Sequence, residues 1–267
     1  MRHTVAVDTE WLISLTALLV GTLVGLTGVG AGAIMTPTLV AVFGVPLPVA
    51  VATDLLFATV TKLFGVVFHH RAGTVDWGIA KKLWLGSIPG TLVGIGLVVF
   101  VASKETTNWL TWPLAVLVLL TAFILFRRAL APASAPSSSR HSGSLVHRRL
   151  LPIAGGFGIG SAVAMTSVGA GALGMALLVR LAPPGVKPQQ LVGTDLVHAI
   201  PLALIAGIAY GSAGLVSWEL LGWMVVGSIP GVILGTLLAG RFSPRVLNFV
   251  LSAILVTAVA MLVIKAA

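Results

Sequence analysis

The stretch Thr27-Gly28-Val29-Gly30-Ala31-Gly32-Ala33 decides how this chain folds, because it returns almost unchanged as Thr166-Ser167-Val168-Gly169-Ala170-Gly171-Ala172 in the second half. Each copy lies between two short apolar runs, where a nearly bare backbone is placed in surroundings with little water for its polar groups. The duplication predicts that the two copies are the two halves of one substrate site.

Composition indicates a membrane protein. Of the 267 residues 57% are hydrophobic and 9% are charged, and the mean hydropathy is +1.08. These values predict an integral membrane protein with one all-α helical bundle, and they exclude a soluble domain. The net charge of +9 does not indicate nucleic-acid binding, since Lys and Arg lie mostly in short connections, as topology signals do. The chain has no cysteine, which excludes disulfides and thiolate metal sites, and we expect no cofactor or metal.

Ten apolar segments form two sets of five. They are expected at residues 11–26, 33–43, 48–69, 79–101, 109–126, 150–165, 172–182, 188–209, 218–239 and 244–264. We expect a first repeat over residues 1–130, a cytoplasmic linker rich in Pro, Ser and Ala over 131–147, and a second repeat over 148–267.

Two further elements are duplicated at a fixed offset. Ala52-Thr53-Asp54-Leu55 matches Gly193-Thr194-Asp195-Leu196, and Gly86-Ser87-Ile88-Pro89-Gly90 matches Gly227-Ser228-Ile229-Pro230-Gly231. Three matches in the same order indicate a tandem repeat. The repeats are predicted to be inverted in the membrane, because that arrangement leaves more Lys and Arg on the cytoplasmic side than a parallel one.

Inversion requires an odd number of full crossings per repeat. The first two segments of each repeat, with 11 to 16 apolar residues, would span roughly 17 to 24 Å as helices, against a hydrocarbon core of about 30 Å. We therefore expect re-entrant helix hairpins over residues 11–43 and 150–182, each followed by three full transmembrane helices. The alternative is two tilted full spans in place of each hairpin, which also preserves inversion.

The glycine tips are the predicted substrate-binding residues. Non-helical backbone at membrane depth must be buried in protein or line a wet cavity. The helices that restart near Gly32 and Gly171 direct N–H groups and positive dipole ends toward the tips, which favours a small anion. Thr27, Thr166 and Ser167 are candidate hydroxyl donors. The alternative is that the glycines only permit close helix packing.

Four ionisable residues within predicted spans are candidates for coupling or gating. Asp54 and Asp195 need partners, because a carboxylate in a bilayer is costly. They either pin the hairpins in place or bind a coupling proton or cation. Lys62 either attracts the anion or extends toward the cytoplasmic surface. His198, one turn after Asp195, is either its partner, a proton relay or an ordinary interior histidine.

Glycines recur every four residues in the fourth and ninth segments. This pattern is typical of close helix contact, and Pro89 and Pro230 are expected to kink the two helices there. A gating hinge is the alternative.

The sequence resembles the sulfite exporter TauE/SafE family of membrane anion permeases over nearly its whole length. The resemblance rests on Leu26-Thr27-Gly28-Val29-Gly30-Ala31-Gly32, its second copy, the Thr-Asp elements and the Gly-Ser-Ile-Pro-Gly elements. It implies transport of small sulfur oxyanions or organosulfur anions across a prokaryotic cytoplasmic membrane. The related thiosulfate importers have a similar hairpin architecture but depend on cysteines, which are missing here.

We therefore expect a secondary transporter that binds sulfite or an organosulfonate between the hairpin tips, while outer helices rock or gate around it. The expected partners are the anion, membrane lipid and a coupling proton or cation. A channel-like permease and a cation transporter using Asp54 and Asp195 are the alternatives within transport. A membrane enzyme acting through Ser167 or His198 lacks a clear set of nucleophile, base and orienting group.

Overall fold

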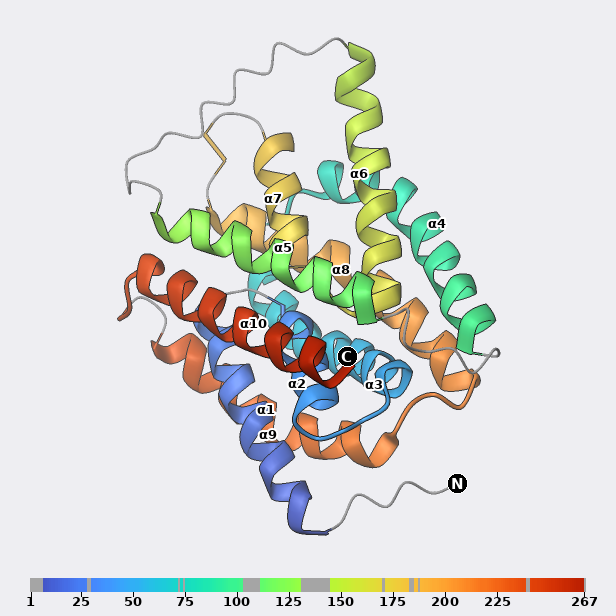
Figure 1. Ribbon diagram of the computed structural model, residues 1–267. Coiled ribbons are helices and arrows are strands. Elements are labelled where there is room, and N and C mark those ends of the chain that lie inside the picture. The colour runs from blue at the N-terminus through green and yellow to red at the C-terminus, as the bar shows by residue number, and fades with distance from the viewer. Residues whose placement is uncertain are drawn as a thin grey trace.

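The computed structural model describes residues 7–27, 30–71, 73, 75–102, 111–130, 145–169, 171–182, 185–186, 188–238 and 241–266, and these residues form an all-helical bundle (Figure 1). Its helices are α1 (Val7–Thr27), α2 (Gly32–Ala41), α3 (Leu47–Arg71), α4 (Trp77–Ala102), α5 (Thr111–Leu130), α6 (Leu145–Thr166), α7 (Ala172–Leu181), α8 (Pro188–Ser212), α9 (Trp218–Leu238) and α10 (Pro244–Ala266). They fall on the ten predicted segments. Most of the predicted linker lies outside the described residues, and its last three residues belong to α6.

The predicted order of helix, break and short helix is present in both hairpins, but their first helices are longer than expected. Helix α1 is long and apolar enough to cross, contrary to the expectation for its segment, and re-entrant insertion of the hairpins stays a prediction. Helices α1 and α6 have 21 and 22 residues because they begin in polar residues before the apolar runs. Seven of the described helices are long and apolar enough to cross a membrane, namely α1, α3, α4, α5, α8, α9 and α10. Helices α2 and α7 have 10 residues each, or about 15 Å, and are too short to cross.

The contacts between helices follow the order of the two repeats. Helix α1 packs along α9, and α6, which holds the equivalent place in the second repeat, packs along α4. Helix α3 packs on α8, and α5 packs on α10, so each of these contacts joins equivalent helices. In Figure 1, α1 begins at the lower end of the molecule and runs upward, whereas α6 begins at the top and runs downward. This is the pattern expected of two repeats related by a two-fold axis, and their orientation in a membrane stays a prediction.

Glycines bring the paired helices into backbone contact. An added Cβ at Gly86 or Gly90 of α4 would overlap the backbone carbonyl of Ile153 or Phe157 in α6. The equivalent glycines of α9 touch α1 in the same way: Gly227, Gly231 and Gly235 lie against the carbonyls of Ser14, Leu18 and Thr22. The glycine stripes are therefore packing surfaces, as the small-residue spacing predicted.

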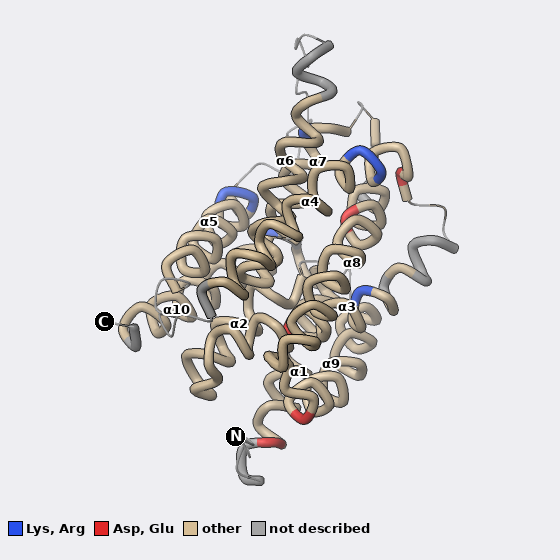
Figure 2. Tube along the Cα trace, turned by 90° about the vertical axis from the view of Figure 1, so that its right-hand side faces the viewer, with Lys and Arg blue, Asp and Glu red and all other residues tan. Residues whose placement is uncertain are grey.

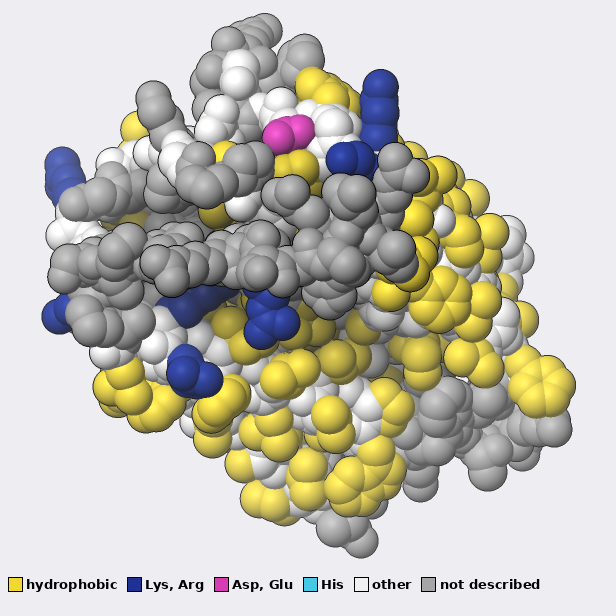
Figure 3. Space-filling model, turned by 90° about the horizontal axis from the view of Figure 1, so that it is seen from above, with side chains coloured by type: hydrophobic (Ala, Val, Ile, Leu, Met, Phe, Trp, Pro, Cys, Tyr) yellow, Lys and Arg dark blue, Asp and Glu magenta, His cyan; other side chains and the backbone are white. Residues whose placement is uncertain are grey.

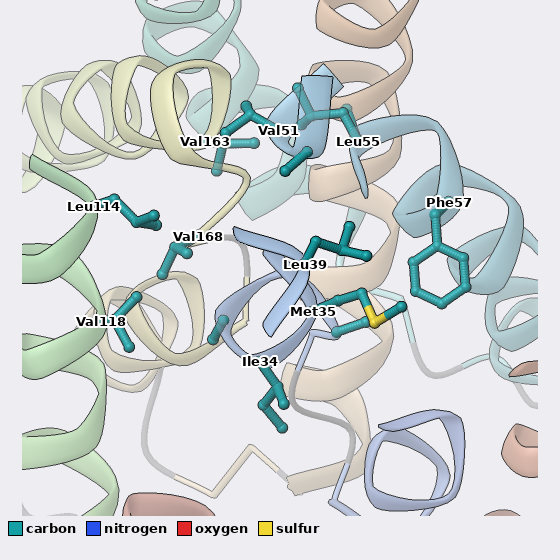
Figure 4. Packing of buried hydrophobic residues seen from close by; sticks show 14 of the residues in the cluster. Ile34, Met35, Leu39, Val51, Leu55, Phe57, Leu114, Val118, Val163 and Val168 are labelled. Atoms are coloured by element: carbon teal, nitrogen blue, oxygen red, sulfur yellow. The ribbon is translucent and has the colours of Figure 1, made fainter. Parts of the chain in front are cut away.

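The short helix α2 lies inside the bundle, whereas α7 is buried mainly at Ala172, Gly174 and Leu178. Seven of the ten residues of α2 are buried, and Met35 and Leu39 pack in the same cluster as Val51, Leu55 and Phe57 of α3 (Figure 4). Leu114 and Val118 of α5, in the same half of the chain, also belong to this cluster. The second half of the chain contributes Val163 and Val168. The hairpin ends are thus enclosed by protein, which satisfies the requirement for irregular backbone at membrane depth.

The outer surface is apolar, as lipid contact requires. Leu85, Leu237 and Ile264 are among the large hydrophobic side chains that point outward. Most charged positions in Figure 2 lie at helix ends or in connections. In the view of Figure 3, Lys and Arg side chains occur at several places on the left and upper parts of the face, and a broad hydrophobic area covers its lower and right parts.

A bulkier residue at Gly90 is expected to separate α4 from α6. Gly90→Val places a side chain against the Phe157 backbone, which cannot move without shifting the helix. We expect a loss of about 1–3 kcal/mol, as for other overpacked sites, seen as a lower melting temperature in detergent. Gly96→Ala is the control, because nothing lies within 4 Å of an added Cβ at that position of α4. Equal melting temperatures for the two variants would contradict this packing.

Candidate functional site

The two glycine tips meet inside the bundle. Helix α1 ends at Thr27 and α2 begins at Gly32, and helix α6 ends at Thr166 and α7 begins at Ala172. An added Cβ at Gly32 would overlap the carbonyl oxygen of Ser167, so the start of α2 touches the other tip directly. The predicted residues Gly28, Val29 and Ala170 lie outside the described residues.

A small cavity lies at this junction. The volume open to the centre of a water molecule is about 20 Å³, enough for one or two waters. Its lining includes Gly30 and Gly32 from the first tip, Ser167, Gly169 and Gly171 from the second, and Lys62 from α3. With Ala31, which also lines it, seven of the predicted site residues surround one space.

Backbone geometry at the second tip departs from a helix. Ser167 has a φ of +59° and Gly169 a φ of +119°, values that side chains rarely permit and that favour glycine. The Gly169 carbonyl accepts a hydrogen bond of 2.9 Å from the Gly174 N–H, which fixes the tip onto the start of α7. The two copies of the glycine stretch differ in residue type at one position, where the first has Gly28 and the second has the strained Ser167.

The starts of α2 and α7 lack side-chain caps, and the Ser167 carbonyl lies against the start of α2. Neither helix has a side-chain cap, so its first N–H groups lack a side-chain acceptor. An ideal Cβ built on Gly30 lies 3.7 Å from Lys62 Nζ and 3.8 Å from the backbone nitrogen of Gly171. One point beside Gly30 is therefore close to both an ammonium group and the beginning of α7.

Lys62 points into the bundle and not toward the surface. Its side chain is 6% exposed and lines the cavity, so the predicted alternative of extension to the cytoplasmic surface is wrong. Its charge acts on both Asp54 and Asp195. Because the two carboxylates offset the charge of the lysine, that charge alone does not make the cavity positive. The starts of α2 and α7 contribute the further attraction for an anion.

Asp54 holds the first hairpin against α3. Its carboxylate is fully buried and accepts a 2.6 Å hydrogen bond from Thr36 Oγ1 in α2, while its other oxygen has no hydrogen-bond partner among the described residues. In the second half, Asp195 Oδ1 lies against the Cα of Gly174 in α7, where any side chain would collide with it. Each aspartate therefore contacts the short helix of its own repeat, which is the geometry of the pinning interpretation.

The threonines beside these aspartates join the two repeats. The N–H of Ser217, just before α9, donates to Thr53 Oγ1 at 3.1 Å, and the N–H of Asp76, just before α4, donates to Thr194 Oγ1 at 2.9 Å. The side chains of Ser217 and Asp76 accept from N–H groups in the first turns of α9 and α4. The Thr-Asp elements thus bind a helix start of the opposite repeat and the short helix of their own.

Two predicted hydroxyl donors are directed elsewhere. Thr27 Oγ1 donates to the Leu23 carbonyl at 2.6 Å, and Thr166 Oγ1 donates to the Ala162 carbonyl at 2.7 Å. A hydroxyl has one hydrogen, so neither donates into the cavity in this conformation. Ser167 does line the cavity; its hydroxyl lies near the Asp54 carboxylate but has no partner in hydrogen-bond geometry.

His198 is bonded to α4 and not to Asp195. Its Nε2 lies 3.0 Å from Ser87 Oγ, and its carbonyl accepts from Trp84 Nε1 at 3.1 Å. Pairing with Asp195, one of the three alternatives, is not found, because the ring turns toward the Gly-Ser-Ile-Pro-Gly element of α4 and its Nδ1 has no hydrogen-bond partner among the described residues. The interior-histidine interpretation fits this position.

Three residues around the site were missed by the sequence argument, namely Thr36, Gly174 and Thr121 of α5, which also lines the cavity. Thr36 carries a weak signal, as a polar residue one turn after Gly32 in an apolar helix. Thr121 carries none, because the corresponding buried residue of α10 is Ala258, which has no hydroxyl.

Loss of the Thr36 hydroxyl is expected to destabilise the first hairpin. Thr36→Val keeps the side-chain shape but leaves both oxygens of a buried carboxylate without a hydrogen bond, at a cost of about 1.5–3 kcal/mol. Thermal unfolding in detergent measures this loss. Thr38→Val is the matched control in α2, since Thr38 donates only to the Ile34 carbonyl of its own helix. Equal losses in both variants would argue against a hairpin held by Asp54.

Comparison with known proteins agrees with this architecture. The sequence matches the family described as "Sulfite exporter TauE/SafE" over residues 13–262. It is 38% identical over 245 residues to the probable membrane transporter protein YjnA of Bacillus subtilis, covering 91% of this chain and 95% of that protein. It is 28% identical to YdhB of the same organism (84% and 88% covered) and 28% identical to a probable membrane transporter protein of Xylella fastidiosa (92% and 91% covered).

No solved structure matches the chain. The family match nevertheless extends from α1 to α10 and includes both tips and both Thr-Asp elements. The relatives are described as transporters and none as an enzyme. The chain is a multi-pass membrane transporter and belongs to the TauE/SafE sulfite exporter family.

Proposed function

We propose that this protein transports a small sulfur oxyanion, with sulfite as the first candidate, and binds it in the cavity between the two glycine tips. The observation that carries the proposal is the position beside Gly30, which lies close to Lys62 Nζ and to the backbone nitrogen of Gly171. A trigonal oxyanion placed there has an ammonium group on one side and a helix start on another.

The electrostatics of the tips favour an anion. Uncapped helix starts present N–H groups and partial positive charge, and in surroundings of low dielectric constant these interact more strongly than in water. Neither Asp54 nor Asp195 is among the described residues that line the cavity. Their carboxylates are turned toward Thr36 and Gly174, so the repulsion that they exert on an anion is not one of direct contact.

The size of the cavity favours a compact anion. At about 20 Å³ it has room for one or two water molecules in this conformation. Binding of any oxyanion therefore requires some separation of the tips. Sulfite has four heavy atoms and no carbon chain, so it requires less separation than an organosulfonate, which is why it is preferred here.

We assign the rigid and the moving parts from the packing. Tight backbone contacts join α1 to α9 and α4 to α6, so each pair moves as one body. Each pair combines the first helix of one hairpin with a long helix of the other repeat. Rocking of these two bodies about the tips would expose the cavity to one side of the membrane at a time. A channel-like permease would use the same donors without that motion.

The cation alternative has less support. Cation coordination needs several oxygens or nitrogens directed to one point. No group of three or more His, Cys, Asp or Glu suited to a metal ion occurs among the residues that the structure describes. A coupling proton remains compatible with the proposal, because Asp54 and Asp195 each have a buried oxygen without a hydrogen-bond partner in that set.

Gly30→Ala tests the anion site directly. Its Cβ fits without a clash, at 3.7 Å from Lys62 and 3.8 Å from Gly171, yet it occupies the position proposed for the anion. We expect the protein to fold and the initial rate of radiolabelled sulfite uptake into proteoliposomes to fall by about 5- to 150-fold, the equivalent of overpacking by about 1–3 kcal/mol.

Gly158→Ala is the control, because nothing lies within 4 Å of an added Cβ at that position of α6. It should transport sulfite at the wild-type rate. Undiminished transport by Gly30→Ala, or cation flux that is independent of any anion, would contradict the proposed function.

A further inference from the structure

Thr121 lies on α5, outside both tips and outside every duplicated element. Its side chain is 1% exposed and lines the cavity between the tips. Its hydroxyl has no hydrogen-bond partner among the described residues. A buried hydroxyl without a partner is unfavourable, so its presence at this position calls for an acceptor that enters the cavity.

Most other described threonines in the helices make a hydroxyl hydrogen bond that Thr121 lacks. A threonine in an apolar helix usually satisfies its hydroxyl by donating to the carbonyl four residues earlier. The described threonines with this bond are Thr22, Thr27, Thr38, Thr59, Thr61, Thr91, Thr166, Thr194, Thr236 and Thr257. Thr121 does not make this bond, and its hydrogen is left for a group in the cavity.

The position is not duplicated. The buried residues of α5 and α10 follow the same spacing, with Leu114 corresponding to Leu251 and Leu125 to Leu262. Thr121 then corresponds to Ala258, which is buried and has no hydroxyl. Pairing between α5 and α10 therefore brings a hydroxyl to the site from one repeat only. A threonine needed only for packing between the two repeats would be expected in both α5 and α10. A hydroxyl that donates to one oxygen of the anion is needed in only one of the two helices.

We propose that Thr121 is a substrate-binding residue, whose hydroxyl donates a hydrogen bond to an oxygen of the anion held between the tips. This inference rests on the proposed function and adds to it a third type of donor, beside the helix starts and Lys62. The ligand class is an oxyanion, because a hydroxyl donor is matched by an oxygen acceptor. A site built around such a hydroxyl loses affinity when the hydroxyl is removed.

The test uses sulfite-induced thermal stabilisation of the purified full-length protein, from which a dissociation constant is obtained. Thr121→Val keeps the shape and removes the donor. Its melting temperature without sulfite should equal or exceed that of the wild type, because an unpaired buried hydroxyl is lost. Its affinity for sulfite should fall by about tenfold or more, as for hydrogen bonds to charged groups. Thr121→Ser should retain affinity within about threefold, since it keeps the hydroxyl.

Thr59→Val is the matched control. Thr59 is buried in α3 and donates to the Leu55 carbonyl of its own helix, so this variant loses a hydroxyl away from the cavity and should keep its affinity for sulfite. If wild type binds sulfite and Gly30→Ala does not, but Thr121→Val binds it as wild type does, the hydroxyl binds water or nothing and this inference is wrong. If the wild type binds neither sulfite, sulfate nor thiosulfate, the proposed function fails and the inference fails with it.

Discussion

Backbone polar groups have no water to bind in the interior of a membrane, and this constraint determines where the present chain can leave the helical conformation. The two helix breaks are predicted to lie at membrane depth, and their described residues contact each other inside the bundle. Gly32 lies directly against the carbonyl of Ser167, and the buried side chains of α2, α3, α5 and α6 surround the junction. The site proposed for the anion is thus a consequence of the same contact that makes the breaks possible.

The remaining structure keeps that contact in register. Glycine stripes bring α4 against α6 and α9 against α1, so the first helix of each hairpin is held by the opposite repeat. The Thr-Asp elements add specific bonds: Thr53 and Thr194 accept from the chain just before α9 and α4, while Asp54 accepts from Thr36. Each hairpin is therefore tied to its own repeat through an aspartate and to the other through a glycine stripe. Such an arrangement fits two bodies that move around one fixed site.

Much of the fold could be predicted from the sequence, because duplication and apolar length are properties of the chain itself. The ten helices, the break at each glycine copy and the packing role of the stripes all follow from spacing. Side-chain partners could not be predicted in the same way. Nearly every face of these helices is apolar, so hydrophobic periodicity does not fix their rotation. The pairing of His198 with Ser87 and the inward direction of Lys62 both depend on that rotation.

The candidate site was predicted only in part for a similar reason. Gly30, Gly32, Ser167, Gly169 and Gly171 share a cavity, as the duplication indicated, but the hydroxyls of Thr27 and Thr166 are bonded within their own helices. The χ1 rotamer of a helical threonine decides whether its hydroxyl donates to the backbone of its own helix or to a ligand, and the sequence does not show which rotamer is adopted. The Thr121 hydroxyl does not bond to the backbone of its own helix. The other repeat has no threonine at the corresponding position, so a comparison of the two repeats could not have identified Thr121.

Location of the bound anion tests the central claim most directly. Selenite has the shape and charge of sulfite and gives an anomalous X-ray signal, so crystals of the wild-type protein grown with selenite would show its position. We predict one selenium peak between Gly30 and Gly171, about 4 Å from Lys62 Nζ, as expected for an oxygen hydrogen-bonded to the ammonium group. A peak outside the tips, or tips far apart with no anion between them, would contradict the account.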